Sequence, residues 1–165
     1  MTSPPRPLEQ RIKDTLHRLE YDIDAWVATA DPAGTPYLVP LSFLWNQETL
    51  LISTAATNPT ARNLRANGRA RLTIGPTRDV VLIEGTAVSV DDVTDDVGDA
   101  FAAKTGFDPR RLRNYPYFAI RPALIQAWRE VNELTGRDVM VSGRWQGQHR
   151  RGQALLRGSP AVSAG

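Results

Sequence analysis

The apolar positions near the start of the chain repeat at the spacing of a helix. They are four, four and three residues apart, at Leu8, Ile12, Leu16 and Leu19. This spacing places them on one face of a helix of about three turns, which we predict over residues 7–20. The proline-rich residues 1–7 are expected to form a flexible leader.

Most of the remaining pattern is that of short strands. AWVATA, YLVPLSFLW and LLIST are rich in strand-forming residues and are separated by the turn-like segments DPAGT and NQET. ARLTI and VVLIEGTAVSV have the same character, and Gly85 inside the second predicts a bulge or a close backbone approach. YFAIRP and ALIQAWREV are predicted as two further strands, and RDVMVSGRW is a candidate last strand.

Two more helices are predicted between these strands. An Asn-Pro pair at positions 58–59 is a helix-start signal, because asparagine caps free amides and proline is tolerated in the first turn. This helix is expected over residues 59–66 and should end at the Asn-Gly pair that follows. A third helix is expected over residues 91–104, with Asp91 or Asp92 as its cap.

Short strands dominate the chain, and most neighbours in sequence can pair antiparallel with helices inserted at the connections. This arrangement favours a mainly β fold, a closed or partly closed antiparallel barrel with peripheral helices, over a doubly wound sheet. We assign the barrel to residues 8–145. Residues 146–165 have the small and polar composition of a flexible basic tail.

Composition narrows the classes of function. The 165 residues suit one ordinary domain, and a net charge of +2 lacks the basic surplus of a dedicated DNA-binding protein, so no nucleic-acid partner is expected. Without cysteine, the chain has no disulfide, thiolate metal site or cysteine nucleophile. No apolar run approaches the roughly 20 residues that span a bilayer, so we expect a cytoplasmic protein with no membrane partner.

No catalytic side chain can be named from motifs. His17 and His149 fit neither a metal-ligand spacing nor a nucleophile pair. The five aspartates between positions 91 and 99 are interpreted as a solvated helix start, favoured by the helix dipole, so no metal site is expected. The glycine-rich loops that bind dinucleotides and triphosphates are absent from the sequence.

The segment NPTARNLRANGRARLTI, residues 58–74, combines four arginines with a predicted helix start. This start has free amides, and the guanidinium of Arg62 lies close to it in sequence. Together with nearby hydroxyls, these groups suit a phosphate or a carboxylate; the hydroxyls are those of Ser53, Thr54, Thr57 and Thr60. The alternative is a capped surface helix whose arginines are only solvated. Spacing alone leaves both interpretations open.

Four segments follow one another in an order that is typical of a known family. They are AWVATADPAGTPYLVPLSFLW, LLISTAATNPTARNLRANGRARLTI, VVLIEGTAVSV and IQAWREVNELTGRDVM. Over about residues 10–145 the chain resembles the pyridoxamine 5'-phosphate oxidase-like superfamily, the split β-barrel flavin and deazaflavin oxidoreductases. The resemblance implies a homodimer that binds FMN or the deazaflavin coenzyme F-420 in a groove at the dimer interface.

By this resemblance, one strand of the barrel runs past the cofactor ring and the next lies near the phosphate. Pro40, Leu41 and Ser42 belong to the first strand, and Ser53 and Thr54 belong to the second. Proline inside a strand indicates locally unpaired backbone, because it donates no hydrogen bond. An edge strand without a ligand explains Pro40 equally well.

Two later residues resemble family positions, and one position differs from the family pattern. Trp128 resembles a tryptophan near the cofactor, although a core or interface role fits it equally well, and Arg137 resembles an arginine near phosphate or substrate. Many members carry a lysine where this chain has Thr60, so one charged phosphate anchor is missing. The implied cofactor-binding residues are Pro40, Leu41, Ser42, Ser53, Thr54, Asn58, Thr60, Arg62, Asn63, Trp128 and Arg137.

The resemblance implies hydride transfer between the cofactor and a small organic substrate, with orientation and charge placement as the protein's contribution. F-420 is preferred over FMN, because four arginines, Arg62, Arg65, Arg69 and Arg71, can meet its polyanionic tail. The alternative is a non-enzymatic split-barrel protein that binds haem or another ligand, or a dimer without cofactor. Fold alone does not decide between these functions.

Overall fold

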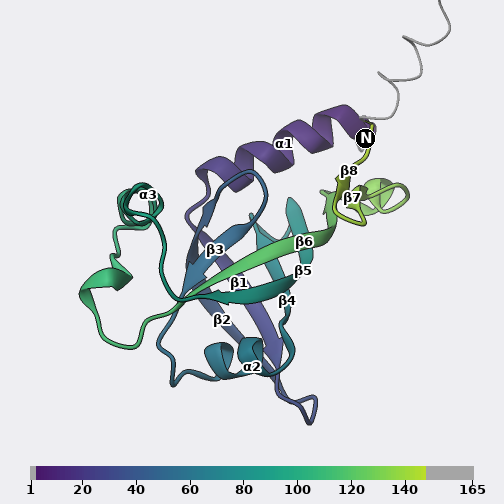
Figure 1. Cartoon of the computed structure of the whole chain (residues 1–165). Coiled ribbons are helices and arrows are strands. Elements are labelled where there is room, and N and C mark those ends of the chain that lie inside the picture. Colours follow the sequence, from purple (N-terminus) through teal and green to yellow (C-terminus); the bar gives the residue numbers. More distant parts are fainter. Residues whose placement is uncertain (1–2, 148–165) are drawn as a thin grey trace, which may run out of the picture.

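The computed structural model describes residues 3–147, which form an antiparallel sheet curled into a barrel (Figure 1). The sheet has eight strands in the order β3-β2-β1-β4-β5-β6-β7-β8, and β3 also pairs with β6. That extra pairing closes β1 to β6 into a barrel. The strands are β1 Asp24–Ala30, β2 Pro36–Trp45, β3 Leu50–Ser53, β4 Arg69–Ile74, β5 Val80–Val90, β6 Tyr117–Trp128, β7 Asp138–Val141 and β8 Arg144–Trp145. The predicted mainly β barrel with peripheral helices is confirmed.

Inward-facing residues of the barrel strands form the main hydrophobic core. Successive side chains of a strand lie on opposite faces, so in β1 the residues Ala25, Val27 and Thr29 are buried while their neighbours are more exposed. Phe43 from β2 and Ile83 from β5 are fully buried in the same cluster. The alternation that predicted strands is therefore also the pattern that fills the barrel.

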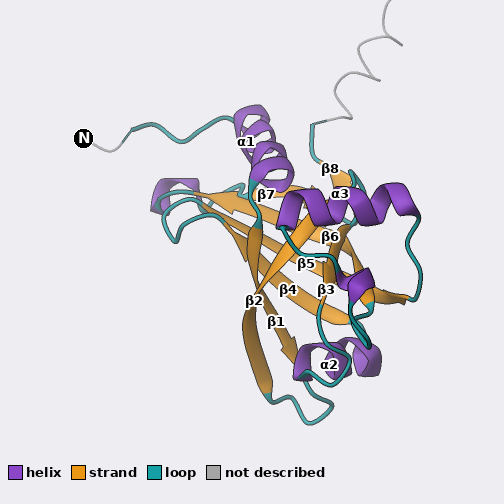
Figure 2. Ribbon diagram, turned by 90° about the vertical axis from the view of Figure 1, so that its left-hand side faces the viewer, coloured by secondary structure: helices purple, strands orange, loops and turns teal. Residues whose placement is uncertain are grey.

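Three helices surround the barrel (Figure 2). α1 (Leu8–Tyr21) and α2 (Pro59–Asn67) lie at opposite ends of it in both views, and both begin within one residue of the predicted start. α2 ends at Gly68, whose left-handed φ of 66° confirms the predicted stop. α3 (Asp95–Thr105) packs beside β2.

The predicted start of α3 was wrong. The helix begins at Asp95, and its capping residue is Thr94 rather than Asp91 or Asp92. The strand before it continues to Val90, so the next four residues are needed to carry the chain from the sheet to the helix. Val93 in this connection packs against the apolar cluster beneath α3.

The two strands predicted over residues 117–131 are one long strand, β6. Pro122 does not interrupt it, because it lies at a bulge: Gly85 pairs with Pro122 and Glu84 with Leu124, which leaves one residue of β6 unpaired. The predicted bulge at Gly85 is confirmed, and an added Cβ there would lie 2.6 Å from the Arg121 carbonyl oxygen. After β6 the chain forms a short 3-10 helix, Val131–Glu133, in place of the predicted strand end.

The candidate last strand is a hairpin of two strands, β7 and β8. Ser142 and Gly143 join them, and both have positive φ angles, of 51° and 72°, as a two-residue hairpin turn of this kind requires. The sequence signal for a turn was therefore present inside the segment.

The predicted tail lies outside the described residues from position 148 onward. No helix within residues 3–147 has the length and apolar character needed to cross a membrane.

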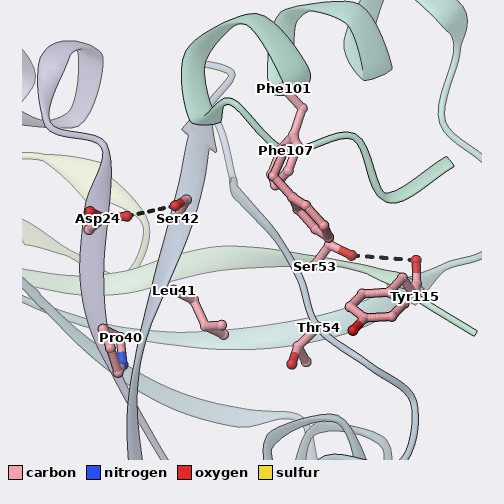
Figure 3. A pocket seen from close by; sticks show the side chains of 9 residues that line it. All are labelled: Asp24, Pro40, Leu41, Ser42, Ser53, Thr54, Phe101, Phe107 and Tyr115. Atoms are coloured by element: carbon pink, nitrogen blue, oxygen red, sulfur yellow. Dashed lines mark hydrogen bonds between the residues drawn. The ribbon is translucent and has the colours of Figure 1, made fainter. Parts of the chain in front are cut away.

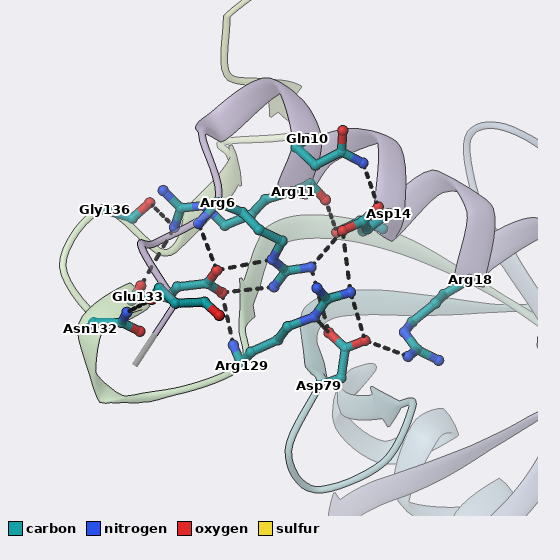
Figure 4. Close-up of polar contacts among 12 residues, drawn as sticks. Arg6, Gln10, Arg11, Asp14, Arg18, Asp79, Arg129, Asn132, Glu133 and Gly136 are labelled. Atoms are coloured by element: carbon teal, nitrogen blue, oxygen red, sulfur yellow. Dashed lines mark hydrogen bonds and ion pairs between the residues drawn. The ribbon is translucent and has the colours of Figure 1, made fainter. Parts of the chain in front are cut away.

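A network of charged side chains joins the segment before α1 to the loop after β6 (Figure 4). Arg6 donates to Glu133 through its backbone amide and its guanidinium at 2.7 to 2.9 Å. Its remaining guanidinium nitrogen lies 2.6 Å from Asp14 on α1. Glu133 is 3% exposed, so the pair is a buried ionic contact between distant parts of the chain.

A second carboxylate, Asp79, extends this network to the turn between β4 and β5. It accepts from Arg18 of α1 at 2.6 Å and lies 3.1 Å from the guanidinium of Arg129. Burial would raise the pKa of Asp79, but donation by Arg18 and Arg129 outweighs burial and lowers it. Hydrogen bonds from Arg6 likewise lower the pKa of Glu133, from 4.5 to about 2. Both carboxylates therefore stabilise the fold in their ionised form.

We predict that Arg6→Ala lowers the free energy of unfolding at pH 7 by about 3 kcal/mol, because it leaves the buried Glu133 carboxylate without its cation. The folded-state pKa of Glu133 is depressed, so its contribution is complete above pH 4.5 and is lost as the pH falls toward 2. Urea denaturation of both proteins between pH 7 and pH 3 should show the difference shrinking. A loss that is constant with pH, or no greater than for the exposed Lys13→Ala, would contradict this assignment.

Candidate functional site

The barrel is open where β2 separates from β3. β2 pairs with the whole of β1 through its residues Pro36 to Ser42. It pairs with β3 only through its last three residues, Phe43, Leu44 and Trp45. In the same register, Ser42 would next face Ser53, yet these two residues are not paired. The two strands part at this point, and the edge of β2 beyond it has no neighbouring strand.

A pocket of about 410 Å³ lies at this opening (Figure 3). Its volume falls in the range of roughly 300–1,000 Å³ that is usual for small-molecule sites. Strand residues of β1 and β2 form one wall, and the end of β3 with aromatic side chains from α3 and the loop after it forms the other. The lining residues are Asp24, Pro40, Leu41, Ser42, Ser53, Thr54, Phe101, Phe107 and Tyr115.

Backbone alternation explains the proline on this wall. The Phe43 amide donates to the Ile23 carbonyl at 2.9 Å, toward β1. Since amides alternate sides along an antiparallel strand, the Ser42 amide and the nitrogen of Pro40 face away from β1, into the opening. Pro40 therefore removes no ladder bond, and the Ser42 amide is directed toward the space that a ligand would occupy.

Hydrogen bonds fix the polar side chains around the opening. Ser42 donates its hydroxyl to the Asp24 carboxylate at 2.6 Å. On the other wall, Ser53 donates to the Pro116 carbonyl at 3.0 Å, and Asn58 donates through Nδ2 to the Thr54 hydroxyl at 2.8 Å. Asn58 thus adjoins the pocket through Thr54, although its side chain makes no capping bond to α2.

Lys104 holds the aromatic wall in place. Its ammonium donates to the Leu19 carbonyl at the end of α1 at 3.1 Å and lies 4.3 Å from the centre of the Phe43 ring. Burial disfavours the charged form and lowers the pKa of Lys104. One turn before it, Phe101 is 1% exposed and packs edge-to-face on Tyr117 at 5.4 Å. These contacts position α3 across the opening.

Five predicted cofactor-binding residues are brought together in the pocket, namely Pro40, Leu41, Ser42, Ser53 and Thr54. Three others lie on α2 outside the lining. Thr60 is 1% exposed, and its hydroxyl has no partner among the described residues. Asn63 is buried and donates to the Thr29 hydroxyl at 3.0 Å, whereas Arg62 is exposed and donates to the Thr57 carbonyl at 2.9 Å.

Trp128 and Arg137 lie far from the pocket within one chain. Ser53 pairs with Tyr117 at one end of β6, whereas Trp128 is the last residue at the other end of that twelve-residue strand. The Arg137 guanidinium lies 5.3 Å from the centre of the Trp128 ring. A second, more open cavity of about 380 Å³ is found there, lined by Thr77, Arg78, Trp128, Arg129, Glu130, Val131 and Leu134.

The family model for pyridoxamine 5'-phosphate oxidase matches residues 11–129, which include the whole barrel and the pocket. The chain belongs to this family. The fold and the family resemblance predicted from the sequence are therefore both confirmed. No curated protein sequence is similar enough to match the chain.

Solved structures with this fold differ in what their names say they bind. A putative pyridoxamine 5'-phosphate oxidase from Listeria innocua is 18% identical, with a TM-score of 0.58 over 73% of this chain and 98% of its own. An F-420 reductase is 21% identical, with a TM-score of 0.52 over 66% and 93%. The haem storage protein HutZ from Vibrio cholerae is 20% identical, with a TM-score of 0.54 over 71% and 91%. At these identities the likeness establishes the shared fold.

Four residues that line the pocket of this chain were not predicted from the sequence. They are Asp24, Phe101, Phe107 and Tyr115. Asp24 gave no signal, because a lone aspartate before a strand is common. Phe101 lies in the predicted third helix, but its place over the barrel opening depends on how that helix packs. Among the described residues, no group of three or more histidine, aspartate or glutamate side chains could hold a metal ion.

We predict that Asn63 is structural, so Asn63→Ala should lower the free energy of unfolding by about 1 to 3 kcal/mol. The change leaves the buried Thr29 hydroxyl without its donor. Adding Thr29→Val should recover part of the loss, since both polar partners are then removed. Denaturant titration measures stability, and ligand titration measures affinity. If Asn63→Ala left stability unchanged but weakened cofactor binding, Asn63 would instead be a cofactor-binding residue.

Proposed function

We propose that the protein is an oxidoreductase that uses F-420, or alternatively FMN, to transfer a hydride to or from a small organic substrate. The observation that carries this proposal is the opening between β2 and β3, where a pocket combines an unpaired strand edge with hydroxyls and aromatic rings. Bound there, such a cofactor supplies the hydride chemistry. The protein binds it, orients it and limits access of water.

The residues present fit a flat ring with an anionic tail. Pro40 and Leu41 offer apolar surface and Ser42 an inward-directed amide on one wall, while Phe107 and Tyr115 offer aromatic surface on the other. These groups suit the ring. The loop from Thr54 to the start of α2 then leads from the pocket toward the first-turn amides of that helix, which suit an anion.

Arginines border this loop and support F-420 as the preferred cofactor. Arg62 donates to the Thr57 carbonyl at 2.9 Å, and Arg65 donates to the Ala56 carbonyl at 3.4 Å. Both side chains are exposed next to the loop, where a polyanionic tail would leave the pocket. Because Thr60 is buried and uncharged, these arginines would have to supply the positive charge that the family lysine provides elsewhere.

We predict that F-420 binds more tightly than FMN in parallel fluorescence titrations at equal salt concentration. Arg65→Ala should weaken F-420 binding about tenfold, the effect of losing one charged partner, and the difference should diminish at high salt. Lys13→Ala removes one exposed charge from α1 at the other end of the barrel and serves as the control. Stoichiometric haem binding without redox turnover would favour the non-enzymatic alternative. Failure of both cofactors to bind would overturn the proposal.

We also propose that two copies of the chain form a homodimer in which each completes the other's site. Trp128 and Arg137 cannot reach the pocket of their own chain, so a second copy is required if they contact the cofactor. An exposed apolar strip lies beside the pocket: Trp26 is 52% exposed and pairs with Pro40, and Leu38 is 58% exposed. An isologous contact through such a strip is the usual way to bury it.

We predict that the protein sediments as a dimer and that Trp26→Glu with Leu38→Glu shifts it to monomer, because two charges would be placed in an apolar interface. The double variant should also lose cofactor affinity, because the second chain would no longer complete the site. Tyr21→Glu changes an exposed aromatic residue on α1 and is the matched control. A wild-type monomer that still binds the cofactor would contradict the shared site.

A further inference from the structure

Asp24 is the single charged residue among the nine that line the pocket. It is the first residue of β1 and pairs with Ser42, whose hydroxyl donates to its Oδ1 at 2.6 Å. Within residues 3–147, no lysine or arginine forms an ion pair with this carboxylate, and no side chain other than Ser42 donates to it. Its second oxygen is therefore left for a ligand or for water.

The aromatic wall faces this carboxylate across the pocket (Figure 3). Phe107 and Tyr115 are in edge-to-face contact, with ring centres 5.8 Å apart, and Phe101 lies beside them. Leu41 lies between the two walls in the same view. A planar ring held between these walls would place one of its edges against the Asp24 carboxylate.

An ionised carboxylate only accepts hydrogen bonds, so the ligand atom that meets it must donate one or carry positive charge. A carbonyl oxygen or a phosphate in the same position would be repelled by the carboxylate. Ser42 fixes the orientation of the carboxylate, which reduces the freedom that a ligand would otherwise have to remove.

We propose that Asp24 is the residue that determines which edge of a heteroaromatic ring enters the pocket, admitting an edge with an N–H donor and rejecting an edge with acceptors alone. This inference rests on the proposed function, because the pyrimidinedione edge with its N–H is common to FMN and F-420. Asp24 thereby orients the ring, with Ser42 as its positioning residue. The anionic tail is kept at the opposite end, near Thr54 and α2.

The test is a set of fluorescence titrations with FMN and F-420, continued with the tighter-binding cofactor and its N3-methylated form. Wild-type protein should bind the methylated form about tenfold more weakly, and Asp24→Ala should bind the unmodified cofactor about tenfold more weakly and no longer distinguish the two forms. Asp24→Asn keeps an acceptor oxygen in place and should restore most of the affinity. Glu48→Ala, which removes an exposed negative charge at the β2–β3 turn, should behave as wild type.

The outcomes separate this inference from the proposed function. If a cofactor binds but neither methylation nor Asp24→Ala weakens it, or if Asp24→Ala tightens binding, the role of Asp24 is overturned and the function stands. If neither FMN nor F-420 binds, both fail together. Thermal denaturation of each variant shows whether a lost affinity reflects lost folding. If Asp24 were purely structural, Asp24→Ala would still bind the N3-methylated cofactor more weakly than the unmodified one.

Discussion

The end of the β2–β3 ladder is the constraint on which the rest of the structure depends. The barrel closes because the four residues of β3 pair with β2 on one side and with β6 on the other, and β3 is too short to cover the far half of β2 as well. This half keeps its pairing to β1 and presents its other edge to the outside. An unpaired edge is normally a liability for aggregation, so natural proteins cover it or interrupt it.

Both ways of managing this edge are found here, and together they make a pocket. Pro40 removes the amide that would otherwise attract another strand, and α3 with its following loop covers the opening with aromatic side chains. Lys104 and Phe101 hold that helix against the barrel. What remains between them is a space lined by four hydroxyl-bearing residues and one carboxylate. The same features that protect the edge therefore define the chemistry of a ligand.

The buried ionic network and the pocket lie at different ends of the molecule. The buried contact between Arg6 and Glu133, with Asp79 and Arg18 beside it, joins α1 to the turns at the Trp128 end of β6. The pocket at the Tyr117 end has no such network, and its one carboxylate is bonded to a serine. A buried ion pair gives rigidity, whereas an unpaired carboxylate beside a cavity remains available to a ligand.

The sequence by itself determined most of the strands, the first two helices, the bulge at Gly85 and the family, because each depends on local patterns of burial, capping and turn residues. The family resemblance also pointed to Pro40, Leu41, Ser42, Ser53 and Thr54, and these five residues line the pocket. Only the tertiary structure decided that Asp24 and Phe107 line the pocket with them and that Asn63 donates a hydrogen bond to Thr29. These roles depend on which strands separate and which helix covers the gap, and contacts between residues far apart in the chain leave no local pattern to read.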